Sequence, residues 1–161
     1  MITVDLSGKW DVYLDSEKRP LSPESFPDTI ILPDSTSNAG LGAVNTEIEY
    51  GCLTDMHKFE GYAWFRRTIE ITPEMAQKCI TLFLERTRMT AIYIDGRECR
   101  FGDSLCAPHR FSLGGLSAGE HELIVRVANV DYPTGGGHMT SRDTQTNWNG
   151  ILGRIELMCY D

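Results

Sequence analysis

The stretch Gly119-Glu-His-Glu-Leu-Ile-Val-Arg-Val-Ala-Asn129 decides the fold class, because its apolar residues follow the two-residue period of a β-strand. One side of such a strand carries Leu123, Val125 and Val127. The residues between them face the other way. We therefore expect a strand with one face in a hydrophobic core.

The same period recurs at residues 80–84, where Ile80, Leu82 and Leu84 alternate with other side chains. Asp95-Gly96 follows a short apolar run and predicts a tight type I′ hairpin, because these two residues tolerate the positive φ angles that this turn requires. Strands are therefore expected over residues 80–84, 91–94, 97–101 and 123–128, and also over 8–14, 62–71, 109–113 and 151–160.

Evidence for helices is sparse. Thr72-Pro-Glu-Met75 resembles a helix start, but the pattern ends by Cys79, so one or two turns are expected. Residues 15–61 are rich in Pro, Ser, Gly, Asp and Asn and predict a long irregular connection, with 30–32 as its clear apolar run. Many short strands without a βαβ rhythm predict an all-β fold, a β-sandwich.

The chain has 161 residues, a length that predicts one domain over 1–161. A formal net charge of -8 argues against nucleic acid or an anionic membrane as the main partner. No apolar run approaches the roughly 20 residues of a membrane span, so we expect a soluble chain with no membrane span. The localisation stays open: periplasmic or secreted if a signal peptide has been removed, and otherwise cytoplasmic.

The five cysteines are odd in number and irregularly spaced, and they predict neither a disulfide framework nor a zinc site. Cys79 and Cys159 lie in strand-like apolar runs and are expected to be buried. Cys106 and His109 are close in sequence, but this spacing matches no zinc pattern and does not establish a catalytic pair. A histidine bonded to backbone is the favoured interpretation of His109.

Residues 138–151 read His-Met-Thr-Ser-Arg-Asp-Thr-Gln-Thr-Asn-Trp-Asn-Gly-Ile and are too polar for a core strand. Amides and a carboxylate suit the hydroxyl groups of a sugar, and the indole of Trp148 offers an apolar face for a pyranose ring. The planar polar groups are those of Asp143, Gln145, Asn147 and Asn149. Two alternatives stay open: a turn-rich connection with one anchoring Trp, and a surface that packs on a neighbouring part of a larger protein.

Several segments in order resemble the N-terminal sugar-binding domain of glycoside hydrolase family 2, which includes β-galactosidases and β-glucuronidases. The matching pieces are Leu6-Ser-Gly-Lys-Trp10, Ile31-Leu-Pro33, Gly61-Tyr-Ala-Trp-Phe-Arg-Arg67, Ala91-Ile-Tyr-Ile-Asp-Gly96, Asp103-Ser-Leu-Cys-Ala-Pro-His109, Gly119 to Asn129 and Trp148-Asn-Gly-Ile-Leu-Gly-Arg-Ile-Glu-Leu157. They cover nearly the whole chain. The stretches Asp103 to His109 and Asp143 to Ile151 are most similar to members from gut Bacteroidetes.

This resemblance implies a jelly-roll β-sandwich of the galactose-binding-like type. It also implies that the chain is a fragment, because the family's two catalytic glutamates lie on a (β/α)₈ barrel, which alone needs about 250 residues. No catalytic residue is therefore expected here. The expected partners are a carbohydrate and the remaining domains of the parent glycosidase.

The resemblance also ranks the candidate substrate-binding residues, because family members carry an acidic residue just before the Trp-x-Gly-Ile-type strand. Asp143 and Trp148 come first, followed by Gln145, Asn147 and His138. A second loop, residues 47–60, lies where some members contribute an amide to the pocket. No metal ligand set and no cofactor are predicted, although the resemblance leaves room for a structural or pocket cation.

The leading hypothesis is a non-catalytic domain of a retaining, exo-acting β-glycosidase of the β-galactosidase-like type. The alternative is a free-standing carbohydrate-binding module that acts without an enzyme. A third interpretation gives residues 138–151 only a docking role.

Overall fold

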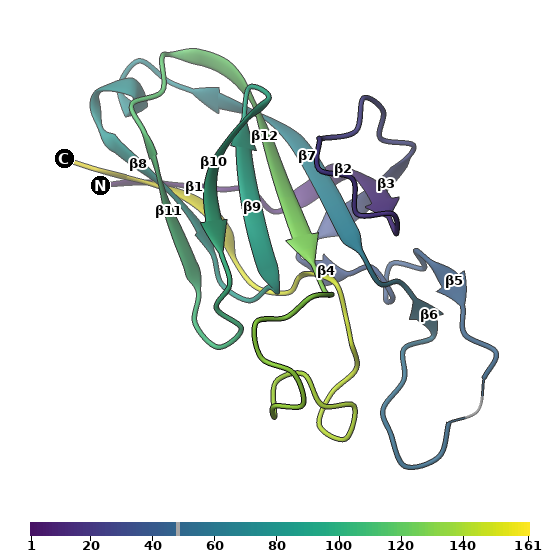
Figure 1. Ribbon diagram of the computed structural model, residues 1–161. Coiled ribbons are helices and arrows are strands. Elements are labelled where there is room, and N and C mark those ends of the chain that lie inside the picture. The colour runs from purple at the N-terminus through teal and green to yellow at the C-terminus, as the bar shows by residue number, and fades with distance from the viewer. Residues whose placement is uncertain (48) are drawn as a thin grey trace.

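The computed structural model describes residues 1–47 and 49–161 and shows two antiparallel sheets packed face to face (Figure 1). The four-stranded sheet has the order β1 (Ile2–Asp5), β14 (Ile155–Tyr160), β8 (Cys79–Leu84), β11 (His109–Gly114). The six-stranded sheet has the order β10 (Arg97–Gly102), β9 (Met89–Ile94), β12 (Gly119–Ala128), β7 (Tyr62–Ile71), β2 (Gly8–Asp15), β3 (Asp28–Leu32). Two short pairs join β4 (Asp34–Ser35) to β13 (Gly150–Ile151) and β5 (Ala43–Val44) to β6 (His57–Lys58).

Strand β12 lies inside the larger sheet, between β9 and β7, as its apolar character requires. Leu123, Val125 and Val127 point into the core between the sheets and are fully buried. The opposite face of this sheet is also largely covered, because Ile124 joins a second cluster with Trp64 and Tyr93. The expected alternation is confirmed, and both faces of β12 are packed.

The Asp95-Gly96 turn joins β9 to β10, with φ angles of 49° and 77°. Both values lie in the left-handed region that a type I′ turn requires, and only Asn, Asp and Gly adopt it at small cost. The predicted hairpin is confirmed.

Helical structure among the described residues is limited to the single 3₁₀ turn η1 (Met75–Gln77). The hydroxyl of Thr72 accepts the backbone N–H of Met75 at 3.2 Å, so the predicted helix start is present but short. None of the helical segments in the described part of the chain has the length and apolar character needed to cross a membrane. The architecture is an all-β jelly-roll sandwich of the galactose-binding-like type, as expected.

Three details of the sequence prediction are corrected. Residues 28–32 form the edge strand β3 within the segment expected to be irregular, and residues 152–154 interrupt the strand expected over 151–160. Cys159 is buried as expected, but Cys79 is exposed. Cys79 shares the outward parity of Thr81 in β8, whereas Ile80 points into the core, so an apolar neighbourhood in sequence did not place it inside.

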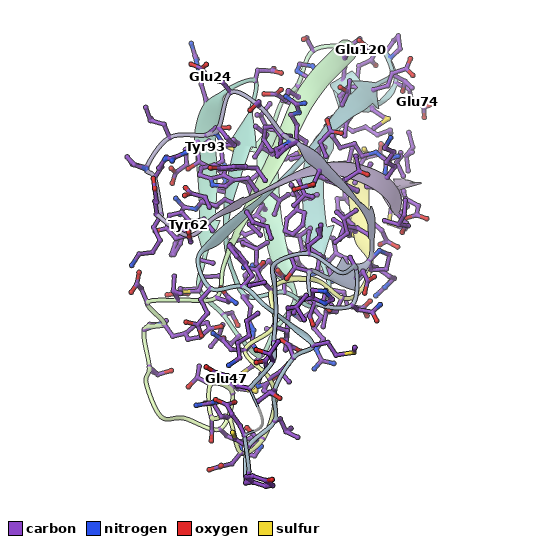
Figure 2. The ribbon with its side chains drawn as sticks, turned by 90° about the vertical axis from the view of Figure 1, so that its right-hand side faces the viewer. Glu24, Glu47, Tyr62, Glu74, Tyr93 and Glu120 are labelled. Carbon is purple, nitrogen blue, oxygen red and sulfur yellow. The ribbon has the colours of Figure 1, made fainter. Side chains whose placement is uncertain are left out.

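The two ends of the sandwich carry different features. Figure 2 shows Glu47 at one end of the molecule and Glu74 and Glu120 at the opposite end. The long connections between β5 and β6 and between β12 and β13 both lie at the Glu47 end (Figure 1). This end therefore gathers the two segments that the sequence singled out.

Candidate functional site

Two loops, residues 49–60 and 131–149, contact each other at this end, and we call them the two-loop lobe (Figure 1). The backbone N–H of Leu53 donates to the carbonyl of Arg142 at 2.9 Å, and the Arg142 guanidinium forms an ion pair with Glu49. Asn147 donates from its side-chain amide to Glu60 at 3.0 Å. The structure thus brings together the two loops that the sequence treated separately.

Asn129, at the end of β12, fastens both loops to the sandwich. Its amide nitrogen donates to the carbonyls of Phe59 at 2.7 Å and Asn147 at 2.9 Å. Its amide oxygen accepts the N–H of Gly61 at 3.0 Å. The side chain is almost fully buried, so each of these bonds satisfies a group that would otherwise lack a partner. In the sequence, Asn129 stands out only as the last residue of the strand motif 119–129.

Arg88 holds the second loop from inside. Its guanidinium donates to three carbonyl oxygens, those of Met139 and Thr146 at 3.0 Å each and of Trp148 at 3.2 Å. It also lies 4.1 Å from the centre of the Trp148 ring. Burial lowers the pKa of Arg88, yet an arginine in a protein keeps its charge. One buried cation therefore fixes the path of the loop.

Trp148 and Gln145 help to anchor the second loop. Trp148 is 8% exposed and its indole N–H donates to the side-chain oxygen of Gln145 at 3.1 Å. The amide nitrogen of Gln145 donates in turn to the carbonyl of Met139 at 2.6 Å. With Arg88 against its ring, Trp148 offers no open face for a pyranose. The geometry matches the alternative interpretation of an anchoring Trp, and the sugar-stacking role has no support from it.

Asp143 and His138 lie on the exposed part of the loop. Both form hydrogen bonds through their backbones: the N–H of Asp143 donates to the hydroxyl of Ser141 at 3.2 Å, and the carbonyl of His138 accepts from the hydroxyl of Thr144 at 2.5 Å. Neither lines a described pocket. Their role in binding substrate stays a prediction.

An open hollow of about 840 Å³ lies between the two loops of the lobe. Asn147 lines it together with Tyr132, whose hydroxyl donates to the side-chain oxygen of Asn147 at 2.8 Å. Burial raises the pKa of Tyr132 to about 12, so the phenol stays protonated and keeps this bond at neutral pH. The rest of the lining comes from both loops and from the two residues that follow β12: Glu49, Leu53, Thr54, Asp55, Lys58, Phe59, Glu60, Asn129, Val130, Asp131, Gly135, Gly136, Thr140 and Arg142.

Of the five predicted contact residues, Asn147 is therefore the one that lines this hollow. Glu60, Tyr132 and Asp55 join it there and were not singled out. The composition of residues 47–60 could have indicated Glu60 and Asp55 as site residues. No sequence pattern indicated Tyr132, because its place depends on a contact between two loops that local patterns do not encode.

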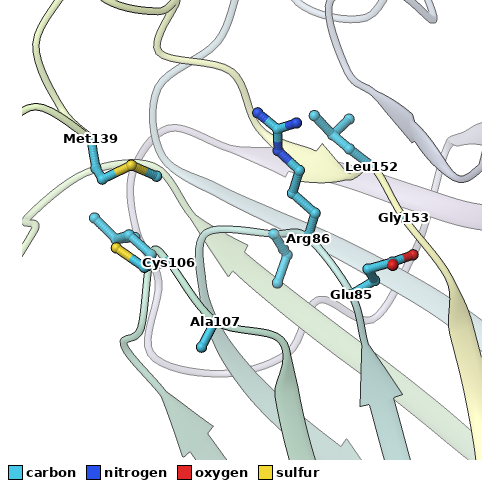
Figure 3. A pocket seen from close by; sticks show the side chains of 9 residues that line it. Glu85, Arg86, Cys106, Ala107, Met139, Leu152 and Gly153 are labelled. Carbon is cyan, nitrogen blue, oxygen red and sulfur yellow. The ribbon is translucent and has the colours of Figure 1, made fainter.

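A second, smaller hollow of about 450 Å³ lies beside Met139, on the side of Cys106 and Arg86 (Figure 3). Cys106 is exposed there, but the nearby His109 is buried and bonded elsewhere. Its Nδ1 lies 2.6 Å from the hydroxyl of Thr90 and its Nε2 lies 2.7 Å from the carbonyl of Ser104. Both ring nitrogens are engaged, and burial lowers the pKa of His109, so it does not serve Cys106 as a base. The backbone-bonded histidine that the sequence favoured is confirmed.

The described residues contain no group of three or more His, Cys, Asp or Glu side chains arranged to hold a metal ion.

Several solved structures of glycosidases share this fold. A β-glucuronidase of an uncultured Clostridium species aligns over 98% of this chain and 29% of its own, with 21% identity and a TM-score of 0.73. A β-D-mannosidase from Dictyoglomus thermophilum aligns over 100% of this chain and 23% of its own, with 16% identity and a TM-score of 0.67. A calcium-binding mutant of Bacteroides uniformis β-glucuronidase 2 aligns over 98% of this chain and 18% of its own, with 19% identity and a TM-score of 0.68.

The chain has the fold of one domain of these glycosidases. It spans less than a third of the length of each of the three. At these identities the likeness establishes the fold, which is the fold implied by the resemblance to glycoside hydrolase family 2. No protein-family model and no curated protein sequence matches the chain.

Proposed function

We propose that this chain is a non-catalytic domain of a retaining, exo-acting β-glycosidase of the β-galactosidase-like type. In this proposal the two-loop lobe forms one wall of a substrate pocket, and the opposite wall, with the catalytic carboxylates, belongs to a barrel in the rest of the protein. The observation that carries the proposal is the lobe itself: two polar loops from distant parts of the chain meet at one end of a sandwich shared with glycosidases.

The chemistry assigns the two parts of the protein different tasks. A retaining glycosidase needs two carboxylates about 5 Å apart, one as nucleophile and one as acid and base. The lobe would supply hydrogen bonds to sugar hydroxyls and would exclude water from the reacting centre. Asn147 and its neighbours suit that task, because amides, carboxylates and phenols pair well with a polyol.

The proposal is tested with the 161-residue chain and with the complete reading frame from which it derives. The isolated chain should not hydrolyse chromogenic β-galactosides or β-glucuronides, whereas a complete protein that continues into a barrel should hydrolyse one of them. Turnover by the pure chain would refute the non-catalytic assignment. A reading frame that ends directly after Asp161 would refute the assignment to a larger enzyme.

The second candidate function is a free-standing carbohydrate-binding module. The observation in its favour is that the hollow already gathers an amide, a phenol and several carboxylates within this domain. Titration of the chain with galactose and with glucuronic acid separates the two functions. A wall of an incomplete pocket should bind only weakly, at millimolar concentrations, because few contacts offset the entropy lost on binding. Micromolar binding would favour the module.

A further inference from the structure

Negative charge exceeds positive charge along the lining of the hollow once ion pairs are taken into account. Its two cations, Lys58 and Arg142, are engaged: Lys58 lies 3.0 Å from Glu47 and 3.7 Å from Glu49, and Arg142 also pairs with Glu49. Asp55 and Glu60 form no ion pair with any described residue. Arg88 and Arg142 act on these two carboxylates only from beyond ion-pair distance. A ligand in the hollow therefore faces an excess of negative charge.

Glu60 is the better placed of these two carboxylates for recognition. One of its oxygens, Oε1, accepts the amide of Asn147 at 3.0 Å, and Asn147 is itself fixed by the hydroxyl of Tyr132. Asn147 also donates to the carbonyl of Asn129 at 3.1 Å. The side chain of Glu60 is exposed, so its other oxygen remains open to solvent and to a ligand.

We propose that Glu60, held in place by Asn147, is a specificity-determining residue that makes this hollow select neutral sugars over uronic acids. A carboxylate accepts hydrogen bonds from two neighbouring hydroxyl groups of a neutral hexose, and these charge-assisted bonds are stronger than bonds between neutral groups. A uronic acid brings its own carboxylate at neutral pH. Close to Glu60 and Asp55 it meets repulsion, with both neighbouring cations already paired.

This inference rests on the proposed function, because it treats the hollow as a sugar site, and it adds a class of sugar to that function. It also separates this chain from two of its structural neighbours, whose names describe β-glucuronidases. Fold likeness at 21% and 19% identity does not transfer a substrate, and the charge of the hollow points away from a uronide.

The test uses two ligands that differ at one carbon: methyl β-D-galactopyranoside and the corresponding galacturonide, in which the C6 alcohol is a carboxylate. Each is titrated at millimolar concentration into the 161-residue chain, and binding is followed by ¹H–¹⁵N chemical shifts of the hollow residues. We expect the neutral sugar to bind about tenfold more tightly, as for one charge repulsion across roughly 6 Å in a half-solvated site. Added salt should reduce this preference.

Glu60→Gln keeps the shape of the side chain and an oxygen that can accept from Asn147, but it removes the charge. We expect this variant to lose most of the preference while its melting temperature stays unchanged. Glu120→Gln is the matched control, because Glu120 is exposed at the opposite end of the molecule (Figure 2). It should retain the full preference.

Three results would overturn the inference: equal or tighter binding of the galacturonide, a preference that survives in Glu60→Gln, or shifts in the hollow with neither sugar. None of them decides the proposed function, which depends on the complete reading frame and its hydrolytic activity. If the chain binds neither sugar but the complete protein continues into an active barrel, the specificity role of Glu60 is refuted and the proposed function is not.

Discussion

Arg88 shows how one side chain can determine the shape of a loop more than 40 positions away in the sequence. Its three acceptors, the carbonyls of Met139, Thr146 and Trp148, are backbone groups of a segment without regular structure. A buried carbonyl that loses its donor costs about 1–3 kcal/mol. The ordered conformation of the loop therefore depends on the hydrogen bonds from Arg88.

We predict that Arg88→Met lowers the free energy of unfolding by about 3 kcal/mol and exposes residues 131–149 to proteases, because three carbonyls lose their donor at once. Urea unfolding and limited proteolysis with mass spectrometry measure both effects. Arg97→Met, at an exposed position of edge strand β10, is the control and should change neither. Full resistance of the Arg88 variant to cleavage in the loop would contradict the anchoring role.

A second residue-scale prediction concerns His121 at the far end of the sandwich. Its Nδ1 lies 2.7 Å from Asp95 and its Nε2 lies 2.8 Å from the carbonyl of Ser117. Both partners are acceptors, so both nitrogens should carry a proton. The hydrogen bond to Asp95 raises the pKa of His121, and the bond to the Ser117 carbonyl adds to this. The hydrogen bond from His121 lowers the pKa of Asp95, with help from the N–H of Glu122.

The sign of the pH effect follows from these directions. Stability from a histidine with a raised pKa is complete below its unfolded value of about 6.5 and is lost as the pH rises through the folded value. The Asp95 contribution is present above about 3.9 and is lost as the pH falls. Urea unfolding should therefore show His121→Gln to be destabilised relative to wild type by up to about 1 kcal/mol at pH 5.5, and by less at pH 8.5. A deficit that is equal at the two pH values would argue against a charged His121.

At the scale of elements, the strands were predictable where one face is buried along the whole length. β7 was expected at residues 62–71 and occurs there, and the run in β12 alternates as predicted. The edge strands β1 and β3 escaped prediction because, at four and five residues, they are too short to show a clear alternation. The six-residue edge strands β10 and β11 were predicted. The polar stretch was correctly predicted to be a loop, but its sequence did not reveal that Trp148 is buried. A buried arginine from another part of the chain covers its ring, which no local pattern could reveal.

The short pair of β13 with β4 closes the second loop of the lobe, and Gly150 permits it. Its φ is +134°, and a Cβ atom there would lie 2.4 Å from the carbonyl oxygen of Asp34. Gly150→Ala should therefore lower the free energy of unfolding by about 3 kcal/mol, from backbone strain and the clash together. Gly115→Ala is the matched control, because a Cβ there meets nothing within 4 Å. Calorimetry of both variants checks this, and similar melting temperatures would count against the close approach.

At the scale of the whole molecule, the lobe differs from the sandwich in what it leaves uncovered. Four of the large apolar side chains with high exposure lie within or just before the first loop: Val44, Tyr50, Leu53 and Met56. The core between the sheets is closed, whereas this end presents apolar and polar groups side by side. Such a surface is expected where another part of a larger protein completes a pocket.

Trp148→Ala in the complete protein separates a pocket wall from a mere docking surface. Removal of the indole leaves a cavity beside Arg88 and Gln145, next in sequence to Asn147. We expect the hollow to shift enough to lower kcat/KM by about 10–100-fold, as displaced positioning groups do. Stability should fall as well, by about 3 kcal/mol, so the assay must run at a temperature where the variant is fully folded. Steady-state kinetics beside Glu120→Gln, which should match wild type, isolates the effect. If the Trp148 variant is less stable but retains wild-type kcat/KM, the loop of residues 131–149 acts in docking and the wall of the pocket must come from elsewhere.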